Sequence, residues 1–484
     1  MRLGAGCALV LAGGQALADA AVNPGKMMRY ELPGYTLVAM NNGQLRRDVA
    51  KLPRLKQALE EITGLKVKSK GIPTVVYVVS SSIWTKYLEP APYIASEFVP
   101  TRFTNYIIAS STTVDQRGLF HEHTHLYVYN QLPGVYPLWF DEGLAVMMER
   151  AQFTGTEVNI YPRDQEDVGG WIPIARVLRT TRTSFEYLNQ SQLSSFHFES
   201  NAMVYRALID DAEFGKRVVK YLEAINNIAT PDEAEALLGN IDDLNMKMRG
   251  YVNDSNRKRV HMDVQRVADQ PLPSGTEVTK LDSLLGIASL CLDAAIHLDR
   301  AHELLDAAAK QPGGDKQVIP LRARLAARLA NDAELEKNLA LLTKDASDLQ
   351  GARAAGLALY ERAQSLGEFS AERRTNLSSR SLTLLDRSLA SRAEDPEAVW
   401  AFAMQAADLK QDMNLALERL VPMFELLPEN ADMALAAGRL LYAKGDPNLK
   451  PFAIAVLRYA NSLEHKRWAA ERITELKKKL GETK

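Results

Sequence analysis

The residues best suited to chemistry lie in one short run, His121-Glu122-His123-Thr124-His125, which contains the pattern H-E-x-x-H. On an α-helix, positions i and i+4 lie one above the other on the same face, so His121 and His125 can direct two imidazoles at one metal ion. Glu122 lies beside that face, where its carboxylate can hold a water molecule next to the same ion. The run therefore predicts a metal centre that also binds water.

A third ligand must come from another element, because a catalytic zinc site normally takes three protein ligands and one water. The best candidate is Glu142, in the first turn of a second helix expected over about 138–151 after Pro137. A carboxylate among bulky apolar neighbours is costly to bury unless a cation or metal pairs with it. The short connection favours antiparallel helices, so we expect Zn²⁺ to be bound by His121, His125 and Glu142.

Two further polar residues lie close to these ligands in the sequence. His123 faces away from the neighbouring histidines on a helix, which makes it a supporting or surface residue rather than a ligand. Asp141 can orient a histidine through the free ring nitrogen. The simpler interpretation is an acidic residue in the first helical turn, which the helix dipole favours.

The elements that must position these residues follow an alternating pattern of strand and helix. Apolar residues at helical spacing predict a helix over 44–63, closed by Gly64, and the β-branched run 73–80 predicts a buried strand. Residues 103–109 predict a half-exposed or edge strand, along which an extended substrate peptide could pair. The metal helix is expected over about 114–130.

The H-E-x-x-H run, followed by PLWFDEGLA over residues 137–145, resembles the gluzincin metallopeptidases, in particular the bacterial peptidase MA-like domain. The resemblance implies that Glu142 is the third zinc ligand, and it extends over about 35–252. The metzincin pattern would need a glycine at 128 and a histidine at 131. The chain has Val128 and Gln131, so that alternative is rejected.

Two positions depart from the gluzincin pattern. The run FESNAMVY over residues 198–205 resembles the next motif of the family, which usually opens with a tyrosine that supports the oxyanion of the intermediate. The matching position here is His197, whose imidazole can also donate a hydrogen bond, and Tyr205 is the alternative donor. Thermolysin-like enzymes also carry an acid one turn after the glutamate ligand, where this chain has Val146. The sequence therefore does not identify the hydrogen-bond partners of the two expected histidine ligands.

The resemblance implies an α+β fold, with a gluzincin (thermolysin-like) domain over residues 21–252 that has a small mixed sheet and active-site helices. It also implies a zinc peptidase acting on peptides or proteins, in which Glu122 is the general base and His197 or Tyr205 supports the oxyanion. The alternative is a non-catalytic exported scaffold, with a degenerate peptidase domain and a protein-binding helical array. The intact Glu122 favours the enzyme, and the absence of tyrosine at position 197 favours the scaffold.

The C-terminal part of the sequence is expected to be all-helical. Residues 253–279 are poor in pattern and predict a linker, and residues 280–484 are rich in alanine and leucine. Trp400, Ala416 and Pro428 fall where the tetratricopeptide pattern has its aromatic, small and closing residues. The resemblance implies a solenoid with a concave face for a protein or peptide partner; a plain helical bundle without a partner is the alternative.

The N-terminus resembles a targeting segment. Arg2 precedes small and apolar residues over 3–13, and the triplets 16–18 and 18–20 both have the A-x-A form of a cleavage site. We expect a signal peptide over 1–20 and an exported protein, periplasmic or secreted; an irregular glycine-rich N-terminus is the alternative.

Length, charge and cysteine content bound the remaining possibilities. A chain of 484 residues is expected to form more than one domain. The net charge of −2 gives no argument for a nucleic-acid or membrane-surface partner, and no stretch is apolar enough for a membrane span. Cys7 lies in the expected signal peptide, which leaves Cys291 alone and excludes a disulfide framework and a cysteine metal site.

Overall fold

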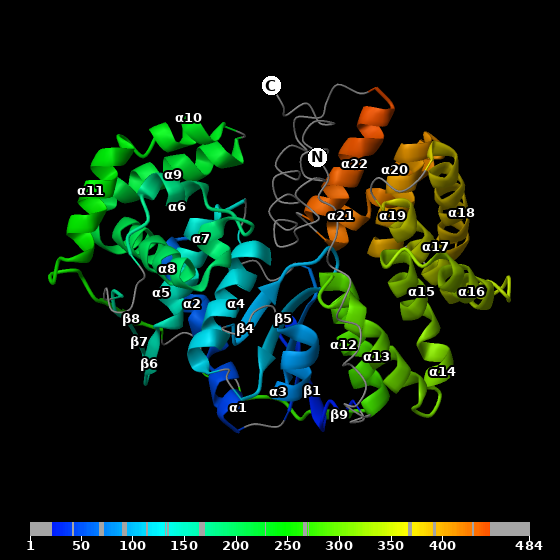
Figure 1. Cartoon of the computed structure of the whole chain (residues 1–484). Coiled ribbons are helices and arrows are strands. Elements are labelled where there is room, and N and C mark those ends of the chain that lie inside the picture. Colours follow the sequence, from blue (N-terminus) through cyan, green and yellow to red (C-terminus); the bar gives the residue numbers. More distant parts are fainter. Residues whose placement is uncertain are drawn as a thin grey trace, which may run out of the picture.

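The computed structural model describes residues 22–445, apart from 41–42, 67–71, 90–93, 113–114, 131, 133–134, 164–169, 228, 265–268, 270, 366–369, 391–393 and 428–429. The expected signal peptide over 1–20 therefore lies outside the described residues. Figure 1 shows a central sheet with one group of helices on each side. The fold is mixed α/β, mostly helical with a small mixed sheet, and is compatible with the α+β expectation.

The central sheet has six strands. They are β1 (Met27–Leu32), β2 (Tyr35–Met40), β3 (Thr74–Val79), β4 (Ser96–Val99), β5 (Asn105–Ser110) and β9 (Thr276–Val278). Their order across the sheet is β4-β5-β3-β2-β1-β9. The three strands β2, β3 and β5 are parallel, while β4, β1 and β9 pair antiparallel with their neighbours.

Two strand predictions had different outcomes. The β-branched run 73–80 forms β3, with five of its six residues buried near the middle of the sheet, so that prediction is confirmed. The edge-strand prediction for 103–109 is wrong, because β5 is buried along its whole length between β3 and β4. The edge belongs to β4, a strand of four residues too short to show a pattern in the sequence.

The first group of helices packs on one face of the sheet. Its members are α1 (Gly43–Val49), α2 (Leu52–Thr63), α4 (Gln116–Asn130), α5 (Leu138–Glu149), α6 (Ile174–Arg179), α7 (Phe185–Leu188), α8 (Gln190–Tyr205), α9 (Ala212–Asn226), α10 (Pro231–Ala236) and α11 (Ile241–Val252). A short α3 (Ser81–Ile83) and two π-helical turns, Trp84–Leu88 and Arg206–Asp210, complete this part of the chain. The helix expected over 44–63 is two helices, α1 and α2, with Pro53 in the first turn of α2 and Gly64 at its end in a left-handed conformation.

The linker prediction for 253–279 is wrong in part. Within this segment β8 (Val260–Asp263) joins β6 (Gln152–Thr154) and β7 (Glu157–Ile160) in a second, three-stranded sheet. At its end β9 pairs with β1 on the far edge of the central sheet. The chain therefore returns to the N-terminal fold before the remaining helices begin.

Eleven further helices, which we call the helical array, follow in the described part of the chain. They are α12 (Lys280–Ala294), α13 (Leu298–Ala309), α14 (Gly314–Gln317), α15 (Ile319–Arg328), α16 (Asp332–Leu342), α17 (Leu349–Ala363), α18 (Ala371–Leu389), α19 (Pro396–Leu409), α20 (Met413–Leu420), α21 (Met423–Leu426) and α22 (Ala431–Ala443). Consecutive helices pack on each other, as α15–α16, α17–α18 and α18–α19 do. The array begins as the cover of the second sheet face, since Leu284 and Ile287 of α12 share a core with Tyr77 and Ile108.

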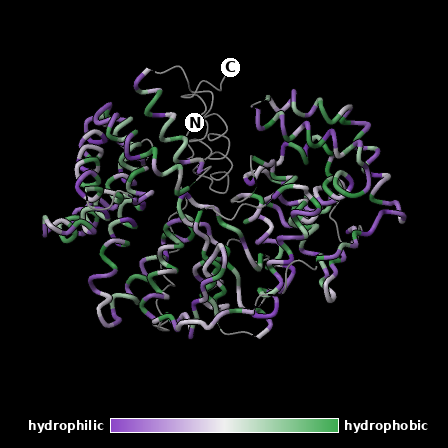
Figure 2. Tube along the Cα trace, turned by 180° about the vertical axis from the view of Figure 1, so that it is seen from behind, coloured by the Kyte–Doolittle hydropathy of each residue, from purple (hydrophilic) through white to green (hydrophobic). Residues whose placement is uncertain are grey.

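Two of the three positions that match the tetratricopeptide pattern lie within the described residues, and both are buried. Trp400 lies on α19 and Ala416 on α20, whereas Pro428 lies outside the described residues. Figure 2 shows hydrophobic and hydrophilic stretches alternating along the helices, as expected for helices that bury one face. Among the described residues, no helix is long and apolar enough to cross a membrane.

The close approach of α5 and α8 gives a first prediction. A Cβ atom at Gly143 of α5 would collide with the main-chain carbonyl of Ser200 on α8. We expect Gly143→Ala to lower the free energy of unfolding by about 1–3 kcal/mol, measured as a fall in Tm by circular dichroism. The matched control is Gly250→Ala on α11, where the added carbon meets no atom within 4 Å, and its Tm should stay equal or rise. Equal Tm values for the two variants would contradict the packing.

Candidate metal centre

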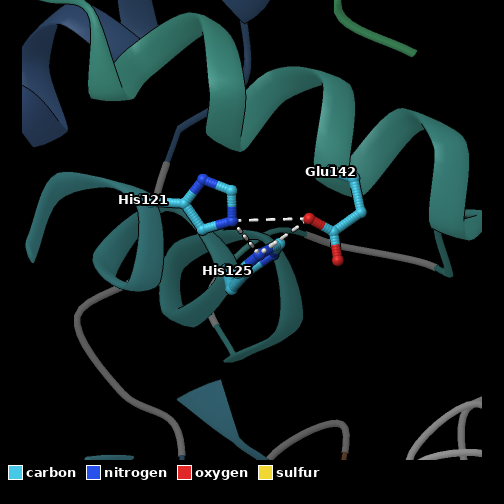
Figure 3. Close-up of side chains that lie close together, drawn as sticks. All are labelled: His121, His125 and Glu142. Carbon is cyan, nitrogen blue, oxygen red and sulfur yellow. Dashed lines mark hydrogen bonds and ion pairs between the residues drawn. The ribbon is translucent and has the colours of Figure 1, made fainter. Parts of the chain in front are cut away.

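Helices α4 and α5 bring the three expected ligands together (Figure 3). The Nε2 atoms of His121 and His125 lie 3.0 Å apart, and each lies 3.4 Å from Oε2 of Glu142. Ligand atoms about 2.1 Å from a tetrahedral ion are separated by roughly 3.4 Å, so the spacing fits one small cation. The three residues form a group that could hold a metal ion.

The carboxylate of Glu142 also fits a cation. The residue is 1% exposed, and its Oε2 accepts no hydrogen bond within the described part of the chain. Burial alone would raise the pKa of Glu142, but the charge that His125 carries when no metal is bound and the close approach of the His121 ring outweigh it and hold the pKa well below its usual range. A buried anionic oxygen facing two imidazole nitrogens is the donor set that a divalent metal completes.

Each of the two candidate histidine ligands is oriented by a carboxylate. Oδ1 of Asp141 lies 2.8 Å from Nδ1 of His125, and Oε2 of Glu149 lies 3.0 Å from Nδ1 of His121. A proton held at each Nδ1 leaves the Nε2 lone pair free for a metal. Asp141 therefore orients His125. From the sequence this was one of two interpretations, the other being an acidic residue placed only by the helix dipole.

The sequence prediction missed Glu149. The gluzincin pattern places the supporting acid one turn after Glu142, where this chain has Val146, whereas the acid lies two turns after it on the same face of α5. The i+7 spacing from Glu142 is the signal that marks it in the sequence. Asp141 and Glu149 are therefore the hydrogen-bond partners of His125 and His121, which the sequence alone did not identify.

A second set of contacts holds the other oxygen of Glu142. The hydroxyl of Tyr187 on α7 donates to Oε1 at 2.8 Å, and Arg182 donates from Nη1 to the Tyr187 hydroxyl at 2.9 Å. The second Nη of Arg182 lies 3.4 Å from Oδ2 of Asp141. Neither residue was predicted from the sequence, because a turn and a helix of four residues, some 40 positions after Glu142, carry no local pattern.

Glu122 is held by the edge strand rather than by the metal helices. Ser96 donates from its hydroxyl to Oε1 of Glu122 at 2.9 Å, and the main-chain N–H of Phe98 donates to Oε2 at 2.6 Å. Each carboxylate oxygen keeps a further lone pair that can accept from water. Burial, reinforced by the negative charge of Glu122, raises the pKa of the neighbouring Glu97 to about 7.

The two candidate oxyanion donors have different positions. Nε2 of His197 lies 3.4 Å from Oε2 of Glu142 and is buried without a hydrogen-bond partner among the described residues. The hydroxyl of Tyr205 lies against the main-chain carbonyls of Lys258 at 2.8 Å and Ile160 at 3.2 Å. The structure therefore brings His197 to the centre and places Tyr205 in the core, so the oxyanion role expected as an alternative for Tyr205 is withdrawn.

His123 is a core residue and not a surface one. Its Nδ1 lies 2.8 Å from the carbonyl oxygen of Leu119, and its ring makes an edge contact with Tyr35. Burial lowers the pKa of His123 to about 4, so the ring is neutral at pH 7.

Comparisons with known proteins add no family. No protein-family model matches the chain, and no curated protein matches it.

The carboxylate behind His121 gives the second prediction. We expect Glu149→Ala to weaken metal binding about tenfold or more, because the ring of His121 loses the partner that fixes its tautomer and orientation. Competition with a chromophoric chelator measures the affinity for Zn²⁺. Glu213→Ala, on the exposed face of α9, is the control and should bind as the wild type does. Equal affinities for the two variants would contradict this role of Glu149.

Proposed function

We propose that this protein is a zinc-dependent peptidase of the gluzincin kind that hydrolyses peptide bonds in peptides or proteins. One observation carries the proposal: three ligand atoms converge at 3.0–3.4 Å, and a fourth group, Glu122, is oriented separately beside them. A purely structural metal site closes its coordination with protein ligands and has no need of an oriented base. Two imidazoles and one carboxylate are the ligand types of a catalytic zinc site.

The chain's own residues divide the chemistry between them. A bound zinc ion would polarise the scissile carbonyl and lower the pKa of a water molecule to about 7. Glu122 accepts the proton of the attacking water and later passes it to the leaving amine. The hydrogen bonds from Ser96 and Phe98 keep both carboxylate oxygens in place while this happens.

Two groups could donate to the oxyanion. His197 has an unpartnered Nε2 beside the ligand group. Tyr187 reaches the same carboxylate from α7, and it would have to turn its single O–H away from Oε1 of Glu142 to donate to the oxyanion. The scaffold alternative depended on the histidine at the position where gluzincins carry a tyrosine. A tyrosine hydroxyl reaches the site from another helix, which weakens that alternative.

Location and partners belong to the same proposal. An exported, periplasmic or secreted peptidase would meet peptide or protein substrates outside the cytoplasm, and the helical array would bind a protein partner or substrate on its concave side.

The general base gives the most direct prediction for activity. We expect Glu122→Gln to abolish hydrolysis of casein or of a peptide library, because an amide cannot take the proton from water. The zinc content of the variant should stay at the wild-type level, since Glu122 is not a ligand. Glu213→Gln serves as the surface control and should keep full activity. Full activity of Glu122→Gln would remove the peptidase proposal.

The oxyanion donors give a separate prediction. His197→Ala and Tyr187→Phe should each lower kcat by about 10²–10³ when the donor in question stabilises the transition state. KM should change much less. A variant whose kcat stays within about twofold of the wild type identifies a residue without that role.

A further inference from the structure

The loop between β4 and β5 inserts into the helical array. The ring of Phe103 packs edge-on against Trp400 of α19 at a centroid distance of 5.8 Å. The guanidinium carbon of Arg102 lies 4.4 Å from the centre of the same indole ring, within the range of a cation–π interaction. Trp400 is 2% exposed, so this contact is part of a core and not a surface touch.

The start of α22 holds the same loop by polar contacts. Asn430 donates from Nδ2 to the carbonyl oxygen of Arg102 at 3.0 Å, and Arg102 donates from Nε to Oδ1 of Asp432 at 3.2 Å. The side-chain oxygen of Asn430 also caps α22 by accepting from the N–H of Met433. Both Asn430 and Asp432 are buried, and such contacts are costly to leave unmade.

The next strand is attached to the array as well. The hydroxyl of Tyr106, the second residue of β5, donates to Oδ2 of Asp293 on α12 at 2.6 Å. Arg324 of α15 joins Asp293 to Glu361 of α17, with distances of 3.0 Å and 2.8 Å. The loop and the start of β5 are therefore fixed by several helices of the array.

The other side of the same strand pair faces the metal centre. Among the described strands, β4 pairs with β5 alone, and the N–H of Phe98 on the open edge of β4 binds Glu122. Only three residues separate Phe98 from Arg102. A displacement of the loop would therefore move Phe98, whose N–H orients Glu122.

We propose that the helical array is a positioning element of the catalytic centre: Trp400, Asn430 and Asp432 hold the loop at Arg102 and Phe103, and the loop fixes β4, which orients Glu122. This inference rests on the proposed peptidase function and assigns the array a second role beside partner binding. Catalytic groups must be held to within about 0.5 Å, and a misplacement of about 1 Å can cost 10²-fold in rate.

The experiment compares variants of the full chain in which the loop contacts are broken singly. Arg102→Ala removes the contacts of the guanidinium with Trp400 and Asp432. Asn430→Ala removes the hydrogen bond to the carbonyl oxygen of Arg102 together with the cap of α22. Arg102→Lys keeps the charge beside Asp432. The matched control is Arg380→Ala, which breaks an exposed ion pair with Glu336 inside the same array. For each protein, kcat, KM, zinc content and the deuterium exchange of the peptide containing Phe98 are measured.

We expect Arg102→Ala and Asn430→Ala to lower kcat tenfold or more, with KM and zinc content within about twofold of the wild type. Exchange at β4 should become faster in both variants, Arg102→Lys should recover part of kcat, and Arg380→Ala should behave as the wild type.

Unchanged kcat and unchanged β4 exchange in Arg102→Ala and Asn430→Ala would overturn the inference, as would equal effects in Arg380→Ala. Should Arg102→Ala not fold, Arg102→Lys and Asn430→Ala decide the matter by the same criteria. A wild-type protein without hydrolytic activity would overturn the proposed function alone, because exchange at Phe98 reports the attachment of β4 without any turnover.

Discussion

One costly feature governs the packing around the metal centre: a carboxylate removed from water. Glu142 is 1% exposed, and an isolated buried charge of this kind is strongly unfavourable. Tyr187 satisfies one of its oxygens, while the other faces imidazole nitrogens. The absence of a side chain at Gly143 lets α8 approach α5 closely, and the same helix carries His197 to the centre. The packing of these helices therefore follows from what Glu142 requires.

The central sheet links this centre to the helical array. Along β3, Val76 and Val78 belong to the core that contains the metal helices, whereas Tyr77 and Val79 belong to the core formed with α12 and α13. The period of two along a strand thus places two helical layers on opposite faces of one sheet. The first helices of the array are therefore a layer of the same fold. Because the sheet lies between the two layers, packing on either face can affect the geometry of the metal centre.

The meeting of the three candidate ligands could be predicted from the sequence because helical periodicity fixes their positions locally. The i, i+4 spacing sets His121 and His125 on one face, and a short connection limits where Glu142 can lie. The edge strand was missed because β4 has four residues, half of them only partly buried. Tyr187, on a short helix, and Arg182, in the turn before it, reach the site through tertiary contacts, and no local period marks such residues. The segment 253–279 carries turn residues that suggest a linker, yet backbone pairing with β1 and β7 makes strands of parts of it.

In the proposed centre, two imidazoles and one carboxylate bind one cation and leave a position for water. Anomalous diffraction at the zinc edge, from crystals of the zinc-loaded full chain, would locate this cation. We expect one peak about 2.0–2.2 Å from Nε2 of His121, Nε2 of His125 and a carboxylate oxygen of Glu142, with solvent as the fourth ligand. A peak elsewhere, no peak, or a site closed by His197 as a fourth protein ligand would rule out this coordination.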